Sequence, residues 1–128
     1  MSVWYDSLKK PRFTPPNKAF WPVWATIYLF VFVSLALYIL SPYKPYFAAS
    51  IALLIIHFTA GFSWTGIFFG RKKMLLAFFD ILIIDITLIS IILLFLQSSV
   101  PAALLLLPYL SWGLFATYLN WMFYQLNR

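Results

Sequence analysis

Four long apolar segments decide what this chain can fold into. They cover residues 20–40, 46–69, 74–96 and 100–126. A helix over residues 20–40 would be roughly 32 Å long, and the hydrocarbon core of a bilayer is about 30 Å thick. The connections between the segments are short, so consecutive helices are expected to be antiparallel neighbours. The pattern predicts an all-α integral membrane protein in which one domain, residues 1–128, contains four transmembrane helices.

Composition excludes several other classes of protein. Only 9% of the residues are charged and the mean hydropathy is +0.92, whereas roughly a quarter of the residues of a soluble domain are charged. No cysteine is present and His57 is the only histidine, so we expect no disulfide, no metal site and no required cofactor. The net charge is +6, but the basic residues lie in short clusters beside apolar segments. This placement indicates membrane topology and no nucleic-acid partner.

The charge distribution predicts an orientation in the bilayer. With four spans, eight of the nine basic residues fall on one side and only Lys44 on the other; the eight are Lys9, Lys10, Arg12, Lys18, Arg71, Lys72, Lys73 and Arg128. The positive-inside rule then places residues 1–19 and the C-terminus in the cytoplasm. Residues 1–19 contain three prolines, which predict an extended segment at the membrane interface.

Three polar residues inside the spans need partners. His57 and Asp85 are expected at similar depths on neighbouring antiparallel helices, and a contact between them would satisfy both. The contact would be either a structural bond or a titratable pair with a proton or ligand role. Asp85 also suggests an alternative function, a small transporter subunit that uses one carboxylate near the bilayer midplane. Asp80 lies closer to the cytoplasmic interface, about 140° around the helix from Asp85, so a catalytic pair of carboxylates is not expected.

Aromatic and small residues recur at helical spacing. Trp24 and Tyr28 are one turn apart in the first span, and the last span carries a stripe of Tyr109, Trp112, Ala116 and Asn120. Such a stripe is either core packing or the wall of a site for a flat apolar ligand. Pro108 predicts a kink in that span.

Two further patterns concern contacts at the surface. Gly61, Gly66 and Gly70 would allow close approach of another helix, either inside the bundle or in a homodimer. Leu119, Tyr124 and Arg128 match a loose sterol-contact pattern, which a snorkelling arginine explains equally well.

Several strings of residues are similar to those of the TspO/MBR family, the bacterial relatives of the mitochondrial translocator protein. They occur in the family's order along nearly the whole chain: Trp4-Tyr5, Lys10-Pro11-Arg12-Phe13-Thr14-Pro15-Pro16, Pro22-Val23-Trp24 with Tyr28, Trp64 with Phe68-Phe69-Gly70, Ala77 with Asp80, and Ala102-Ala103-Leu104-Leu105 through Pro108-Tyr109-Leu110 and Trp112 to Phe115-Ala116, Leu119-Asn120 and Asn127.

This resemblance implies a pocket for porphyrins such as protoporphyrin IX, and for sterols. By position, Trp24, Tyr28, Trp112 and Ala116 would form pocket wall, and Tyr5 and Pro15 would belong to a lid. The resemblance also implies a bacterial cell membrane as the location, and the expected role is sensing, transport or light-dependent breakdown of the tetrapyrrole. In breakdown, Trp24 and Trp112 would act on the photo-excited ring, without a conventional catalytic acid, base or metal.

The sequence also departs from the family pattern. The family has five spans, and the first would precede Trp4. We therefore expect either a truncated or mis-started chain or a four-helix variant whose missing wall comes from a partner. Gly61 stands where the family usually has Asn, and His57 where it usually has Gln, so the polar contact to the ligand is altered. His57 could replace that contact and, as an axial ligand, would favour a metallated porphyrin.

Overall fold

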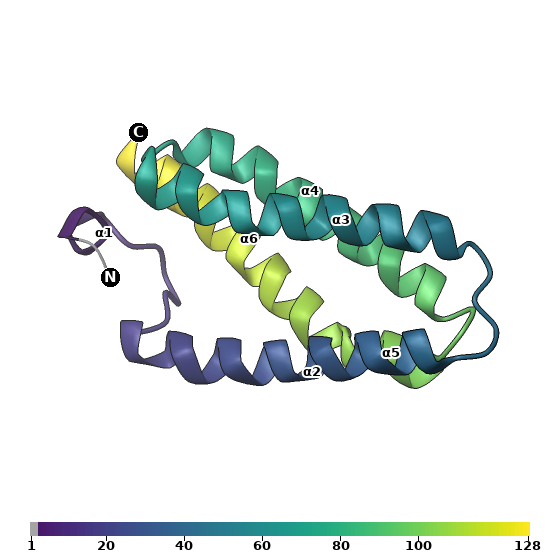
Figure 1. Cartoon of the computed structure of the whole chain (residues 1–128). Helices are drawn as coiled ribbons and strands as arrows, with labels where there is room; N and C mark the ends of the chain where they lie inside the picture. The colour runs from purple at the N-terminus through teal and green to yellow at the C-terminus, as the bar shows by residue number, and fades with distance from the viewer. Residues whose placement is uncertain (1–2) are drawn as a thin grey trace.

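The computed structural model describes residues 3–128 and shows an all-α bundle (Figure 1). Its elements are α1 (Val3–Ser7), η1 (Asn17–Ala19), α2 (Phe20–Leu40), α3 (Phe47–Thr65), η2 (Gly66–Gly70), α4 (Met74–Phe95), α5 (Val100–Leu105) and α6 (Leu107–Asn127). Four helical stretches are long and apolar enough to cross a membrane: Asn17–Leu40, Phe47–Gly70, Met74–Phe95 and Val100–Asn127. The prediction of a four-span integral membrane protein is confirmed. Residues 1–2 of the predicted domain lie outside the described residues.

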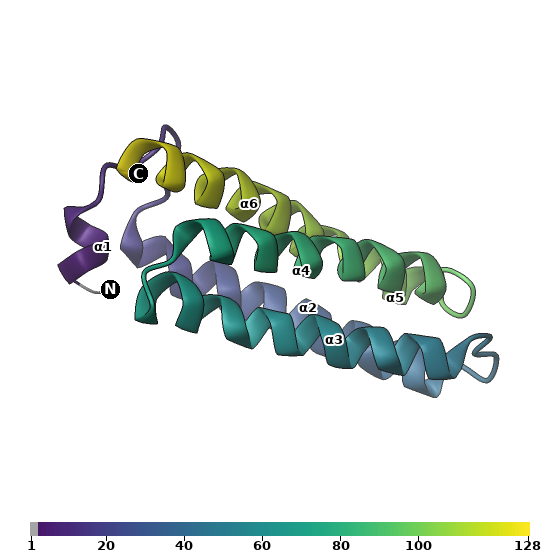
Figure 2. The same ribbon diagram turned by 90° about the horizontal axis from the view of Figure 1, so that it is seen from above.

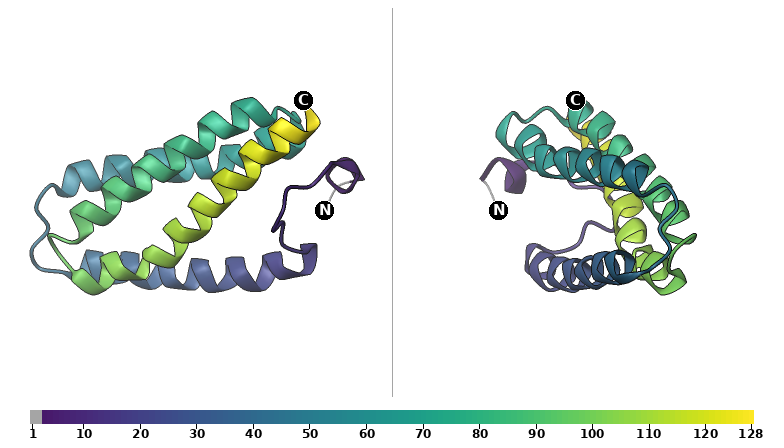
Figure 3. Two further views of the ribbon diagram at one scale, coloured as in Figure 1. Left: turned by 180° about the vertical axis from the view of Figure 1, so that it is seen from behind. Right: turned by 45° about the vertical axis from the view of Figure 1, so that its right-hand side comes forward.

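The bundle has one tightly packed side and one open side. Helix α3 packs along α4, and α4 packs along α6, whereas α2 packs mainly against α5 and only weakly against α6. In the right-hand view of Figure 3, α2 lies apart from α3, and α5 and α6 connect the two sides. The helices therefore follow an open C in cross-section, in the order α3, α4, α6 with α5, and α2.

The last span is broken into α5 and α6 at Leu106, two residues before Pro108. Pro108 has no N–H to continue the helical ladder, and the Leu106 N–H bonds to the carbonyl of Ala103 at 3.1 Å. The carbonyl of Ala102 is thereby freed from its usual partner four residues on, and it accepts a hydrogen bond from Ser34 Oγ of α2 at 2.6 Å. The break thus supplies an attachment point for α2.

All basic clusters lie at one end of the bundle, as the charge pattern predicts. Figure 2 shows α1, the C-terminus and the turn between η2 and α4 together at that end. Lys44 lies at the opposite end, in the connection between α2 and α3. Which end faces the cytoplasm stays a prediction.

The proline-rich segment is less extended than predicted, because its first residues form the one-turn helix α1. No proline occurs before Pro11, and Ser7 Oγ donates to the carbonyl of Trp4 at 2.6 Å. At the far end of the segment, η1 runs directly into α2. Between them, Phe13 adopts a φ of 71°, a conformation that non-glycine residues seldom take.

Candidate functional site

An aromatic wall, formed by Trp24, Tyr28 and Trp112, lies where α2 approaches α6. The Trp24 and Tyr28 rings stack at a centroid distance of 5.5 Å, and the Trp24 ring meets Trp112 edge to face at 6.1 Å. Phe20 adds a second edge contact to Trp112 at 6.4 Å. The structure therefore brings together three ring residues that the sequence places on two different spans.

The aromatic wall is only half covered by protein. Tyr28 is 52% exposed, and Trp24 and Trp112 are half-buried. The buried face of α2 consists of Ile27, Val31, Ser34 and Tyr38, so Trp24 and Tyr28 lie at the edge of the contact with α5 and α6, where Trp24 still packs against the core cluster. Large apolar rings with one free face suit a flat apolar ligand, which stacks on them without displacing other side chains.

Ala116 and Gly61 are both half-buried. Ala116 packs against the cluster of Ala60, Ile81 and Ile84, where α3, α4 and α6 meet. A Cβ built on Gly61 would have no other atom within 4 Å, so there is open space beside this position of α3.

His57 is enclosed by a polar network that links α3, α4 and α6. Its side chain is 1% exposed. Nδ1 lies 3.1 Å from the carbonyl of Ile84 and 3.0 Å from Thr87 Oγ1, and Nε2 lies 2.8 Å from the Tyr109 hydroxyl. The carbonyl can only accept, which assigns the proton of the neutral ring to Nδ1 and leaves Nε2 to accept from Tyr109.

The predicted contact between His57 and Asp85 is wrong, because Asp85 faces α6. Its carboxylate accepts a hydrogen bond from Thr117, whose hydroxyl also lies 2.8 Å from the carbonyl of Gly113. Asp85 is 5% exposed, and a Cβ on Gly113 would lie 3.0 Å from Asp85 Oδ1. Gly113 and Thr117, one turn apart on α6, are the sequence signal for the contact with Asp85. The prediction from the sequence used neither of them.

Asn120 is a cross-link between three helices. It is 1% exposed; its Oδ1 accepts from Trp64 Nε1 of α3 at 2.8 Å, and its Nδ2 donates to the carbonyl of Met74 in α4 at 2.8 Å. Asn120 and Tyr109 therefore point into the packed side of the bundle, while Trp112 points toward α2. The predicted stripe on α6 is divided between two neighbours.

The proline-rich segment is anchored across the end of the bundle. Tyr5 is 4% exposed and packs on Phe69 and Phe123, each with a centroid distance of 5.5 Å. Burial raises the pKa of Tyr5, and the nearby charge of Asp6 adds to the effect. Asn127 of α6 holds the backbone of Lys9 from both sides, with Oδ1 accepting from its N–H and Nδ2 donating to its carbonyl, each at 2.8 Å. Pro15, the other predicted lid residue, is half-buried.

The glycines predicted to allow close approach of another helix lie on an open part of the surface. Gly66 and Gly70 have open space where a Cβ would be, so no helix within residues 3–128 uses them for close approach. Homodimerisation through these glycines and Gly61 stays a prediction.

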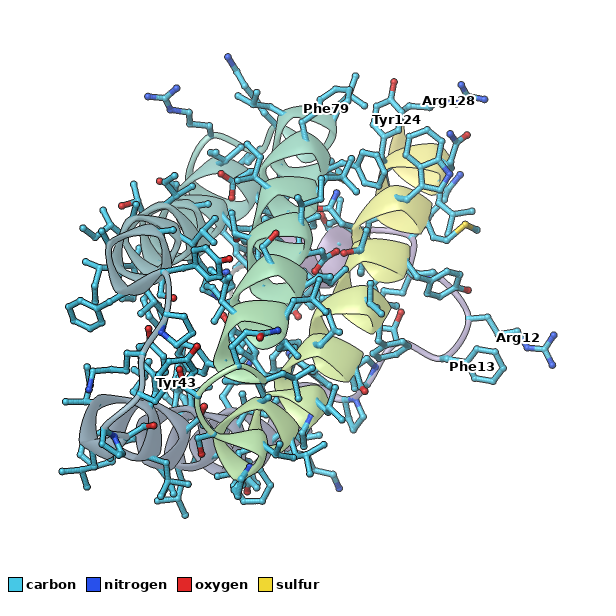
Figure 4. All side chains as sticks on the ribbon, turned by 90° about the vertical axis from the view of Figure 1, so that its right-hand side faces the viewer. Arg12, Phe13, Tyr43, Phe79, Tyr124 and Arg128 are labelled. Carbon is cyan, nitrogen blue, oxygen red and sulfur yellow. The ribbon has the colours of Figure 1, made fainter. Side chains whose placement is uncertain are left out.

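Leu119 is 9% exposed and belongs to the core cluster with Tyr5, whereas Arg128 is exposed at the C-terminus. Figure 4 shows Tyr124 and Arg128 at that end of α6. Sterol contact stays a prediction as well.

The comparisons with known proteins all indicate the same family. Residues 1–126 match the model of the TspO/MBR family. The Tryptophan-rich protein TspO of Bacillus cereus is 36% identical over 126 residues, which cover 98% of this chain and 81% of the relative. The protein of the same name from Archaeoglobus fulgidus is 37% identical over 99% of this chain and 82% of its own length. The Translocator protein of Ovis aries is 32% identical over 98% of this chain and 75% of its own.

Proposed function

The chain belongs to the TspO/MBR family, and we propose that it is a membrane receptor for a flat, apolar tetrapyrrole of the protoporphyrin IX type. The observation that carries the proposal is the aromatic wall, in which Trp24, Tyr28 and Trp112 form a ring surface with one half-exposed side. A macrocycle stacked there would bury apolar area against rings that already pack on one another, so binding would order few side chains.

The two helices that carry the aromatic wall are held to different degrees, and this difference favours a receptor role. Trp112 belongs to α6, which the packed side of the bundle holds in place, whereas Trp24 and Tyr28 belong to α2. A small movement of α2 would adjust the spacing between the rings without breaking a core. A sterol is the second ligand class, since it is also rigid and apolar and would reach the same wall from the bilayer.

The experiment is a titration of the purified chain with protoporphyrin IX, followed by the porphyrin's own absorbance. Trp24→Phe and Trp112→Phe are each expected to weaken binding about fivefold, because a smaller ring loses roughly 1 kcal/mol of stacking. Trp121→Phe is the matched control, since Trp121 also lies on α6 but packs on Phe78 of α4. If all three variants bind as the unchanged chain does, the aromatic wall is not the site.

Three roles would follow binding: sensing, transport or light-dependent breakdown. Illumination of the complex tests breakdown, because porphyrin absorbance should then decline faster with the unchanged chain than with Trp112→Phe at equal occupancy. Equal rates in the two samples would leave binding alone as the function of the wall.

A haem-type ligand held by His57 is a weaker variant of the proposal. Nε2 of His57 is 2.8 Å from the Tyr109 hydroxyl and the side chain is 1% exposed, so axial ligation would first require Tyr109 to move away. The alternative of a transporter subunit would work through Asp85. That carboxylate is enclosed between α4 and α6, and loss of ligand flux in liposomes with Asp85→Asn would be the result in its favour.

A further inference from the structure

A second concave surface lies on the outer side of the contact between α2 and α6. It is an open groove of about 690 Å³ whose lining is almost entirely apolar and includes Pro22 and Thr26 of α2 and Ser111, Trp112 and Phe115 of α6. On a helix with 3.6 residues per turn, Pro22 and Thr26 lie on the face opposite to Trp24 and Tyr28. The groove therefore lies on the other face of α2 from Trp24 and Tyr28, toward the lipid, and shares only Trp112 with the aromatic wall.

The α2 side of the groove leads to a cation. Lys18, Pro22 and Thr26 are spaced four residues apart, so they follow one another along the same face of the helix. From Lys18 to Thr26 the helix rises about 12 Å, close to half of the roughly 30 Å hydrocarbon core. The groove on this side thus extends through about one leaflet of the bilayer, and the exposed Lys18 marks its headgroup end.

The α6 side of the groove leads to a second cation. The ring of Phe115 stacks on Tyr118 at 6.3 Å, and the Tyr118 hydroxyl donates to the carbonyl of Arg12 at 3.4 Å. The guanidinium of Arg12 lies 5.1 Å from the centre of the Phe13 ring. Figure 4 shows Arg12 and Phe13 projecting together away from the bundle, beside α6. An aromatic ring and a guanidinium in this position suit the headgroup region.

Neither cation is neutralised by the protein. Within residues 3–128, Arg12 and Lys18 form no salt bridge with a carboxylate. The acid nearest in sequence is Asp6, whose Oδ1 lies 3.4 Å from the amide Nδ2 of Asn17. One negative charge beside two positive charges leaves this end of the groove with a surplus that attracts an anion.

We propose that the groove binds one anionic phospholipid, with an acyl chain along the apolar lining and the phosphate between Arg12 and Lys18. The depth of one leaflet fits a chain that enters from the bilayer, and the two cations fit a headgroup with net negative charge. A zwitterionic phospholipid would place the same chain in the groove but would gain less from the cations.

Native mass spectrometry of the full chain in detergent tests the proposal. Phosphatidylglycerol and phosphatidylcholine with identical acyl chains are titrated separately, and the ratio of their affinities is the measured quantity. Arg12→Gln combined with Lys18→Gln is expected to lower the preference for phosphatidylglycerol about 25-fold, or about fivefold for each cation near a membrane surface.

Matched variants make the result specific. Lys72→Gln with Lys73→Gln removes two charges from the same end of the bundle but from the turn before α4, and should leave the preference unchanged. Thr26→Trp fills the groove, and should weaken both lipids equally.

Three outcomes would overturn the proposal: equal affinities of the two lipids for the unchanged chain, an equal loss in the Lys72 and Lys73 variant, or unaltered lipid binding with Thr26→Trp. Soluble glycerol phosphate should compete poorly, because it has no chain. Competition as strong as that of the lipid would identify a simple anion site and would also overturn the proposal. Because Trp112 lines both surfaces, the variant that separates this proposal from porphyrin binding is Arg12→Gln with Lys18→Gln, which leaves every ring of the aromatic wall in place.

Discussion

The two sides of the bundle are held together by different means. Between α3, α4 and α6, buried polar groups bond from helix to helix: Asn120 to Trp64 and Met74, His57 to Thr87 and Tyr109, and Asp85 to Thr117. Helix α2 is held at its far end, where Ser34 and Ser41 bond to carbonyls of Ala102 and Ser98. Near the proline-rich segment it contacts α6 through aromatic rings.

This difference shows how a membrane bundle can be rigid and adaptable at once. Lipid tails are as apolar as leucine, so apolar contacts alone give helices little reason to associate, and directed bonds supply specificity. The packed side has such bonds at three levels, at Asn120, Asp85 and His57. The near half of α2 has none to another span among the described residues, and there the aromatic wall is located. Four predictions test this contrast between the packed side and α2, and the expected effects decrease from the first to the last.

Replacement of Asn120 by Leu should have the largest effect on stability. The variant removes two hydrogen bonds and leaves Trp64 Nε1 without its partner, while the Met74 carbonyl keeps only its helical bond within α4. We expect a loss of about 2–3 kcal/mol in the free energy of unfolding. Thermal unfolding in detergent measures it, with Asn17→Leu as the control, because Asn17 is exposed. Equal stability of the two variants would contradict the cross-linking role.

Gly113→Ala should cost somewhat less, about 1–2 kcal/mol, because the added Cβ would lie 3.0 Å from Asp85 Oδ1 and displace the carboxylate that Thr117 holds. Gly61→Ala is the matched control. It meets no atom within 4 Å and should stabilise α3 slightly through helix propensity. The decisive comparison is the double variant Gly113→Ala with Asp85→Ala, in which most of the loss should be recovered. No recovery would show that the loss does not come from contact of the added methyl group with the carboxylate.

Sequence reasoning reached the framework of the bundle but not its internal pairing. Span number and the shared end of the basic clusters follow from hydropathy and charge, since both depend on the bilayer and not on side-chain contacts. The partner of Asp85 depends on the rotation of α4 about its own axis, and a similar depth to His57 does not determine it. The break at Leu106 was foreseen from Pro108 as a kink, but its consequence for Ser34 required the three-dimensional arrangement. Trp24 and Trp112 were paired through family resemblance, not through spacing.

Ser34→Ala tests the attachment of α2 at the break in the last span. Loss of the bond to the Ala102 carbonyl should cost about 1 kcal/mol and should increase amide hydrogen exchange in α2 more than in α4. Ser63→Ala is the control, because Ser63 bonds only within its own helix, to the carbonyl of Thr59. If exchange rises equally in α2 and α4, the two sides of the bundle open as one unit and the contrast between them fails.

The smallest effect concerns the anchor of the proline-rich segment, Tyr5. Burial and the charge of Asp6 raise the pKa of Tyr5 above the ordinary value of 10.0, so the folded state favours the neutral phenol. Its contribution to anchoring is therefore complete below pH 10 and is lost as the pH rises through the raised pKa. Difference titration of tyrosinate absorbance between the unchanged chain and Tyr5→Phe measures the ionisation directly.

Release of α1 should accompany that ionisation. Trp4 packs on Phe68 and Phe69 beside Tyr5, so its fluorescence should shift toward that of a solvated indole over the same pH range. In Tyr5→Phe the ring is retained without an ionisable hydroxyl, and the shift should be absent. A shift that persists in Tyr5→Phe would mean that α1 leaves the bundle for another reason, and α1 would then belong with the near half of α2 among the loosely held parts of the molecule.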